Sequence, residues 1–103
     1  MEKYYNKNGD VGVLISHDFG AGWSTWNTSE IAIDKRIIEE FLKNVSSQEM
    51  CNYIQKIGYD RPYMEGYSSL ELEFIPRGVR FKIYEYDGYE FIMTENDDDF
   101  IMA

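Results

Sequence analysis

Apolar and polar residues alternate with a period of two in several short segments of the chain. In residues 70–74, LELEF, the leucines and the phenylalanine fall on one side and the glutamates on the other, which predicts a half-buried strand. Residues 11–16, VGVLIS, are apolar and bounded by turn-forming residues, which predicts a buried strand. The alternation returns in residues 79–94, VRFKIYEYDGYEFIMT, where the central Asp-Gly pair predicts a β-hairpin.

The hairpin has two candidate registers. A two-residue turn pairs Tyr86 with Tyr89, whereas a three-residue loop with a bulge at Gly88 pairs Glu85 with Tyr89. A slip of one residue exchanges the two faces of a strand, so burial selects strongly between them. The bulged register collects five apolar residues on one face, namely Val79, Phe81, Ile83, Phe91 and Met93. We therefore expect the bulged register, with Gly88 in the left-handed region.

Helical periodicity occurs between these strands. Residues 35–44, KRIIEEFLKN, carry an apolar stripe and follow Asp34, a suitable N-cap. A second stripe lies in residues 46–58, SSQEMCNYIQKIG, where Ser46 and Glu49 have the spacing of a capping box. The order of elements predicts an α+β fold, with an antiparallel sheet of about four to five strands and two helices packed on one face.

The length fits one domain covering residues 1–103, with residues 1–10 and 96–103 as frayed ends. The final residues, NDDDFIMA, begin with a run of like charges and end with apolar residues. The alternatives to fraying are that this tail pairs as an edge strand or packs against the sheet. The sequence leaves open whether the protein forms a homo-oligomer.

Charge and cysteine content narrow the range of functions. The chain carries 19 acidic and 10 basic residues, a net charge of −9. Because nucleic-acid affinity depends largely on Lys and Arg at the phosphates, this composition argues against direct nucleic-acid binding. It favours a basic protein partner, or it simply maintains solubility. With no membrane-spanning apolar segment, no signal-peptide core and one cysteine, Cys51, we expect a cytoplasmic protein.

The longest irregular segment, residues 17–29, HDFGAGWSTWNTS, contains both tryptophans. Long ordered loops in small domains are usually functional. Its glycines let a ligand approach the backbone amides, which can hold an anion, and its tryptophans offer stacking faces for a nucleobase. The alternative is that the tryptophans fold inward as a lid on the core. Together with two residues of a tyrosine-rich loop at 59–69, the candidate ligand-binding residues are His17, Phe19, Gly20, Ala21, Gly22, Trp23, Ser24, Thr25, Asn27, Arg61 and Tyr63.

The two tryptophans are expected to have different roles. Trp26 lies nearer the apolar residues Ile31 and Ile33, so we expect it to pack in the core. Trp23 directly follows the flexible segment that ends at Gly22, so we expect it on the accessible surface.

Catalytic and metal sites have weaker support. His17, the single histidine, precedes Asp18 and lies near Ser24, which allows a small hydrolase, although no nucleophile elbow surrounds that serine. One His and one Cys do not make a zinc site of usual spacing, and the acidic run 97–99 lacks the other ligands of a calcium loop. We therefore assign no catalytic residue, no metal and no cofactor.

The segment GAGWSTWN at residues 20–27 resembles a family of small proteins encoded mainly in bacteriophage and prophage genomes. The resemblance also includes residues 34–44, DKRIIEEFLKN, and 78–92, GVRFKIYEYDGYEFI, and extends over nearly the whole chain. It implies a non-enzymatic accessory protein of the bacterial cytoplasm during infection. We therefore expect an anti-defence protein that sequesters a small nucleotide-like ligand through residues 17–29. The first alternative is an acidic inhibitor of a host defence protein, acting in some cases as a nucleic-acid mimic. The second is a hydrolase using His17 and Ser24.

Overall fold

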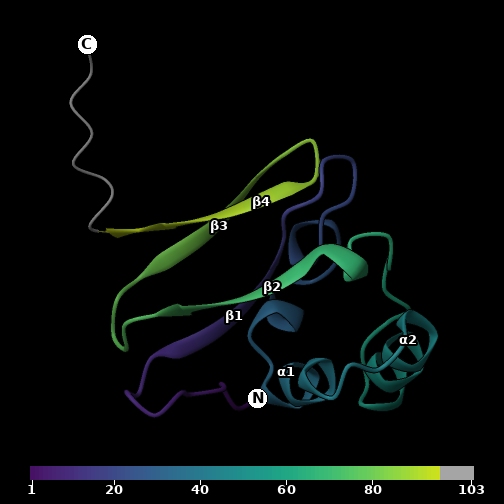
Figure 1. Cartoon of the computed structure of the whole chain (residues 1–103), viewed down its shortest axis with the longest axis horizontal. Coiled ribbons are helices and arrows are strands. Elements are labelled where there is room, and N and C mark those ends of the chain that lie inside the picture. Colours follow the sequence, from purple (N-terminus) through teal and green to yellow (C-terminus); the bar gives the residue numbers. More distant parts are fainter. Residues whose placement is uncertain (96–103) are drawn as a thin grey trace.

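A computed structural model of the chain describes residues 1–95, and the expectations for residues 96–103 lie outside this part (Figure 1). Two α-helices and four strands are present among the described residues, so the α+β class is confirmed. In chain order they are β1 (Val11–Ser16), α1 (Lys35–Leu42), α2 (Ser47–Lys56), β2 (Leu70–Ile75), β3 (Phe81–Tyr86) and β4 (Tyr89–Thr94). Short 3-10 helices cover Ser24–Trp26, Ser29–Ala32 and Tyr67–Ser69.

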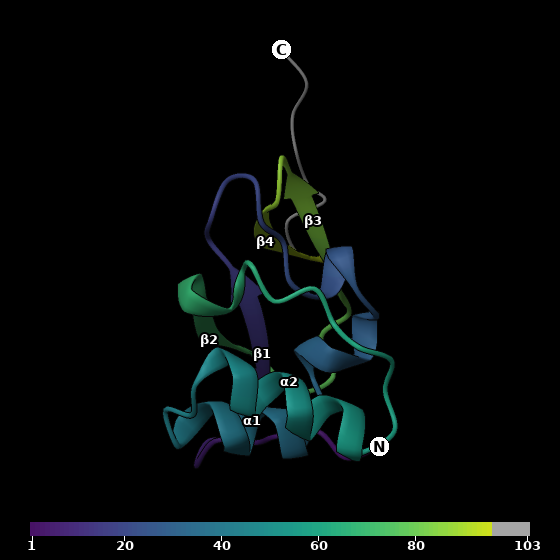
Figure 2. The ribbon, with the colours of Figure 1, turned by 90° about the vertical axis from the view of Figure 1, so that its right-hand side faces the viewer.

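The strands form two antiparallel pairs, so the prediction of one four- to five-stranded sheet is wrong. β1 pairs with β2 from Val11↔Ile75 to Ser16↔Leu70, and β3 pairs with β4. The helices lie on one side of the β1–β2 sheet and the β3–β4 hairpin lies on the other (Figures 1 and 2). The reason is visible in β1, in which all six residues are buried. A strand with two apolar faces needs a cover on both, and the hairpin supplies the second one.

Two apolar clusters follow from the alternation of side chains along β1. Leu14 faces the helices, and its cluster includes Ile38 of α1 and Ile54 of α2. Val13 and Ile15 point to the opposite side, where hairpin side chains including Ile83 and Ile92 pack against them. The β1–β2 sheet is therefore the middle of three layers.

Both predicted helix caps are present. The Ser46 side chain accepts a hydrogen bond from the Glu49 backbone N–H at 3.1 Å. Asp34, fully buried, caps α1 by accepting from the Arg36 backbone N–H at 2.9 Å, and its Oδ2 accepts from the Arg36 guanidinium and the Tyr59 hydroxyl, each at 2.8 Å. Burial alone raises the pKa of Asp34, but these hydrogen bonds outweigh it and hold the pKa below its ordinary value. Burial and the neighbouring Asp34 raise the pKa of Tyr59 to about 12.

The hairpin turn has two residues, so the bulged register is wrong. Tyr86 pairs with Tyr89, and Asp87 and Gly88 have φ values of 50° and 88°, the pattern of a type I′ turn. The left-handed Gly88 is confirmed. Type I′ turns match the right-handed twist of the strands, and this register points Glu90 inward. The number of apolar residues on one face favours the bulged register. That criterion leaves out the hydrogen bonds that Glu90 makes in the two-residue register.

The N-terminal residues, expected as a frayed end, run along β1 and the start of α1. The Gly12 N–H donates to the Tyr4 carbonyl and the Lys35 N–H donates to the Glu2 carbonyl, both at 2.8 Å. This path places Lys3 beside the groove described below. No helix among residues 1–95 combines the length and the apolar content needed to cross a bilayer.

Candidate functional site

Trp23 and Trp26 have the reverse of their predicted positions. The Trp23 side chain is fully buried in the cluster that contains Leu14 and Ile31. Trp26 is 38% exposed, with its ring centroid 5.4 Å from that of Tyr63. The prediction is wrong because it took residues 20–22 to be flexible, whereas the Gly20 N–H donates to the Asp87 carbonyl of the hairpin turn and the Ala21 carbonyl accepts from the Ser16 hydroxyl.

Glu90 of β4 holds this loop from within. Its side chain is fully buried and accepts four hydrogen bonds: from the backbone N–H groups of Ser16 at 2.8 Å, Trp23 at 2.9 Å and Thr25 at 3.0 Å, and from the Thr25 hydroxyl at 2.5 Å. Converging amides of this kind form an anion-binding nest. The sequence predicts a nest of exposed amides around Gly20 and Gly22 that holds an external anion. In the structure the converging amides are instead those of Ser16, Trp23 and Thr25, and they bind the chain's own Glu90 carboxylate.

The glycines allow three backbone segments to lie close together. A Cβ built on Gly66 would lie 2.7 Å from the Gly22 carbonyl oxygen and 2.8 Å from that of Ala21. A Cβ on Gly88 would lie 2.9 Å from the Gly22 amide nitrogen. The N–H of Gly20 also donates to the Asp87 carbonyl. Residues 20–22 are therefore packed between the hairpin turn and residue 66, and the glycines serve this contact.

The remaining predicted ligand-binding residues separate into two groups. Asn27 lies beside the tyrosine-rich loop, where its Oδ1 accepts from the Tyr63 N–H at 2.7 Å, and it lines a cavity of about 400 Å³ together with Arg61. His17 and Phe19 lie elsewhere, and both rings stack on Tyr89, with centroid distances of 5.0 and 4.9 Å. Of the other loop residues, Ser24 is buried, and within residues 1–95 no hydrogen bond joins it to His17. The loop therefore does not form one continuous binding surface.

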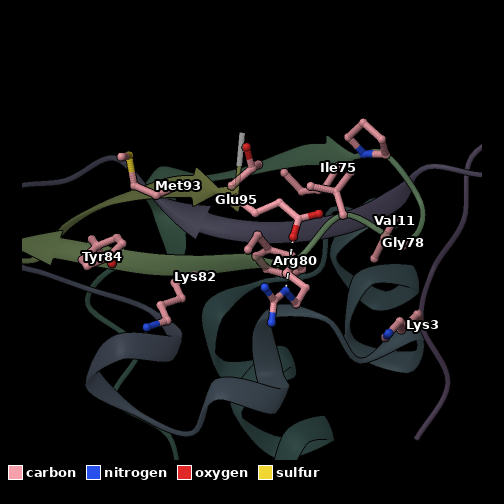
Figure 3. A pocket seen from close by; sticks show the side chains of 13 residues that line it. Lys3, Val11, Ile75, Gly78, Arg80, Lys82, Tyr84, Met93 and Glu95 are labelled. Carbon is pink, nitrogen blue, oxygen red and sulfur yellow. Dashed lines mark hydrogen bonds and ion pairs between the residues drawn. The ribbon is translucent and has the colours of Figure 1, made fainter. Parts of the chain in front are cut away.

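A larger groove, of about 700 Å³, lies where the beginning of β1, the loop between β2 and β3, and β3 itself meet (Figure 3). Side chains from all four strands line it, among them Val11, Ile75 and Phe81, and Tyr84 and Met93 lie at one end. Concave sites with a largely apolar lining and a few converging polar groups are the usual form of small-molecule sites.

Three cations surround this groove. Arg80 and Lys82 project on the same side of β3, and Lys3 approaches from the N-terminal segment (Figure 3). The single acidic residue among the described lining residues is Glu95, whose carboxylate lies 3.2 Å from Arg80 Nε. Lys3 and Lys82 form no ion pair within residues 1–95. Three of the 10 basic residues of an acidic chain therefore lie around one groove.

Sequence reasoning missed the groove. One signal was available, because Arg80 and Lys82 are two residues apart and so fall on one face of the predicted strand. Lys3 carried no signal, because its position depends on the path of the N-terminal segment.

Another cluster, which we call the His17 cluster, comprises His17, Glu71 and Glu73. His17 Nδ1 lies 2.8 Å from a Glu71 carboxylate oxygen, and its Nε2 lies 3.3 Å from one of Glu73. The glutamates follow the predicted alternation of β2, and Leu70 is buried opposite them. The sequence indicated that Glu71 and Glu73 point outward, but not that His17 meets them.

Searches with the sequence against protein-family models and curated proteins, and with the structure against solved structures, gave no significant match.

Proposed function

We propose that this protein binds a small anionic ligand with an apolar or aromatic part, such as a nucleotide-like molecule, in the groove between β1 and β3. The class of ligand is the one that the sequence suggested, but the site is different. The observation that carries the proposal is the presence of Lys3 and Lys82, neither of them ion-paired within residues 1–95, beside an apolar groove of about 700 Å³.

The loop at residues 17–29 supports this proposal less well. Its backbone amides bind Glu90, and Trp23 is buried, so neither is available to an external ligand. In the groove, by contrast, two cations lack acidic partners within the described residues, and Phe81 and Tyr84 offer ring surface nearby. Charge-assisted contacts to phosphate or carboxylate oxygens are about twice as strong as neutral hydrogen bonds.

The net charge of −9 repels an anionic ligand, so the attraction of the cations at the groove has to exceed the repulsion by the rest of the chain. At 0.15 M salt the Debye length is about 8 Å, so exposed carboxylates farther away than that are largely screened. Arg80 pairs with Glu95, the single acidic residue among the described lining residues, at 3.2 Å. A phosphate in the groove is therefore attracted mainly by Lys3 and Lys82, the cations that are unpaired within residues 1–95.

Isothermal titration calorimetry with nucleoside monophosphates and the matching uncharged nucleosides tests the proposal. We expect the monophosphate to bind at least about tenfold more tightly than the nucleoside, and Lys82→Glu to weaken its binding by at least about tenfold. The matched control is Lys56→Glu at the exposed end of α2, which should leave the affinity within about twofold of the parent. Equal affinity for nucleoside and monophosphate, or equal losses in the two variants, would contradict the proposal.

A second candidate function is favoured by two exposed aromatic side chains, Tyr86 at the end of β3 and Phe19 of the loop at residues 17–29, which together we call the hairpin tip. Tyr86 is 74% exposed and Phe19 is 64% exposed, and both lie beside Tyr89. Aromatic side chains are enriched at protein interfaces, and the net charge of −9 favours a basic partner. Inhibition of a host protein in a phage context stays a prediction.

The test for this candidate is the binding of a labelled cationic peptide that also carries leucines, measured by fluorescence anisotropy. We expect Phe19→Ala together with Tyr86→Ala to abolish the binding and increasing salt to weaken it. Binding that survives the double substitution would exclude the hairpin tip as the interface.

A further inference from the structure

We propose that the His17 cluster binds a divalent transition-metal ion, with zinc as the best chemical match. One ligand atom each from His17, Glu71 and Glu73 lie within 4.8 Å of one another. Zinc binds imidazole nitrogen and carboxylate oxygen at about 2.0–2.2 Å, so two atoms on one ion are separated by at most about 4.4 Å. Rotation of the Glu71 side chain, which is 60% exposed, closes the remaining gap. This inference is independent of the proposed groove ligand, because the two sites share no residue.

The scaffold brings the three side chains together before an ion arrives. Glu71 and Glu73 are two residues apart on β2, so they project from the same face. His17 directly follows β1, and its N–H donates to the Ser69 carbonyl at 3.3 Å. Its ring is stacked on Tyr89 with an interplanar angle of 13°. A fixed imidazole beside two carboxylates on a strand loses little conformational freedom when it binds an ion.

The charges of the cluster favour a cation. The two carboxylates lie close to opposite ring nitrogens of His17, that of Glu71 at 2.8 Å from Nδ1 and that of Glu73 at 3.3 Å from Nε2. A metal ion requires one ring nitrogen without a proton, and the two negative carboxylates beside the ring compensate the positive charge of the ion. Metal binding therefore competes with protonation and weakens in acid.

The mixture of donors selects the type of ion. Magnesium and calcium prefer sites made only of oxygen, whereas an imidazole nitrogen suits zinc and its neighbours in the first transition row. Three protein ligands leave at least one coordination position for water, as at zinc ions with an open position. The side chains of His17, Glu71 and Glu73 are 27%, 60% and 41% exposed, so the ion has direct access from solvent.

The chain contains a single histidine, which gives the test an unambiguous probe. Protein dialysed against EDTA and then against buffer is titrated with Zn²⁺, while the His17 imidazole is followed by two-dimensional ¹H–¹⁵N NMR and the heat by calorimetry. We expect one ion per chain, a shift of the imidazole nitrogen signals, and no displacement by millimolar Mg²⁺. Lowering the pH from about 7.5 to 5.5 should weaken binding at least about tenfold.

Variants separate this site from ordinary acidic surface. His17→Asn, and Glu71→Gln combined with Glu73→Gln, should each raise the Kd for Zn²⁺ at least about tenfold, whereas Glu39→Gln on the exposed side of α1 should not change it. Circular dichroism and urea unfolding confirm that each variant is folded. Unchanged imidazole signals on addition of Zn²⁺, or an unchanged Kd in a folded His17→Asn protein, would overturn the proposal.

Discussion

Replacing Glu90 by Gln leaves the size and shape of the side chain almost unchanged, but it removes the negative charge that accepts hydrogen bonds from Trp23 and Thr25 in the loop at residues 17–29. One oxygen of Glu90 accepts from the Ser16 N–H, and the other accepts from the N–H groups of Trp23 and Thr25 and from the Thr25 hydroxyl. A glutamine has one acceptor oxygen and one NH₂ group, so at least one backbone N–H must face another donor.

The less costly orientation of the glutamine places its NH₂ group against the Ser16 N–H. One buried N–H is then unpaired, which costs about 1–3 kcal/mol, and three charge-assisted hydrogen bonds become neutral at a cost of roughly 1 kcal/mol each. Relief from burying a carboxylate without a cation offsets part of this loss. We therefore expect Glu90→Gln to lower the free energy of unfolding by about 3 kcal/mol.

Urea unfolding followed by tryptophan fluorescence measures this loss, because Trp23 lies in the affected segment. With a typical m-value, the transition midpoint should fall by at least about 1 M, and the amides of Trp23 and Thr25 should exchange faster with solvent. Glu39→Gln, on the exposed side of α1, is the control and should stay within about 0.5 kcal/mol of the parent. A loss below about 0.5 kcal/mol in Glu90→Gln, with unchanged protection of these two amides, would refute the reasoning.

Other changes test the packing and the buried cap. Trp23→Ala should cost about 3–5 kcal/mol in unfolding experiments, whereas Trp26→Ala should cost less than about 1.5 kcal/mol; equal losses would contradict their different burial. Gly88→Ala should lower stability by at least about 2 kcal/mol, since its φ is 88° and a Cβ would meet the Gly22 amide. The lowered pKa of Asp34 contributes stability above pH of about 4 that is lost as the pH falls through the folded value. The pKa of Tyr59 is raised from 10.0 to about 12, so this residue contributes stability that is present below pH 10 and lost toward pH 12. In Tyr59→Phe, the decrease of the urea midpoint between pH 10 and 12 should therefore be smaller than in the parent.

The elements of the fold could be predicted because each depends on local chemistry. The caps at Asp34 and Ser46 are set by neighbouring residues, and both are found where the sequence placed them. The strand predicted over residues 70–74 is also present as β2, but Phe74, predicted to point inward, is 39% exposed, and the next residue, Ile75, is buried. The arrangement of the strands was not predictable in this way. Whether the β3–β4 hairpin extends the sheet or covers its face depends on whether β1 is buried on both faces. All six residues of β1 are buried, and this burial arises only when the three layers pack together.

The candidate site was harder to predict because its residues meet only in three dimensions. Lys3 and Lys82 are 79 positions apart in the chain, and His17 is more than 50 positions from Glu71. Local reasoning predicted that backbone amides of the loop at residues 17–29 hold an external anion, whereas the amides of Ser16, Trp23 and Thr25 bind a carboxylate of the chain itself. It had no means of recognising that Glu90, which looked like the solvent-facing residue of a strand, is the anion.

The hydrogen bonds of Glu90 also impose an order on folding. They join residues that are 65, 67 and 74 positions apart, so the segment near the start of the chain is completed by a carboxylate near its end. Contacts of such long sequence separation close large loops and form late. During synthesis, the ribosome must release β4 before the amides of Trp23 and Thr25 find their acceptor, so burial of the Trp23 indole should be among the last events of folding.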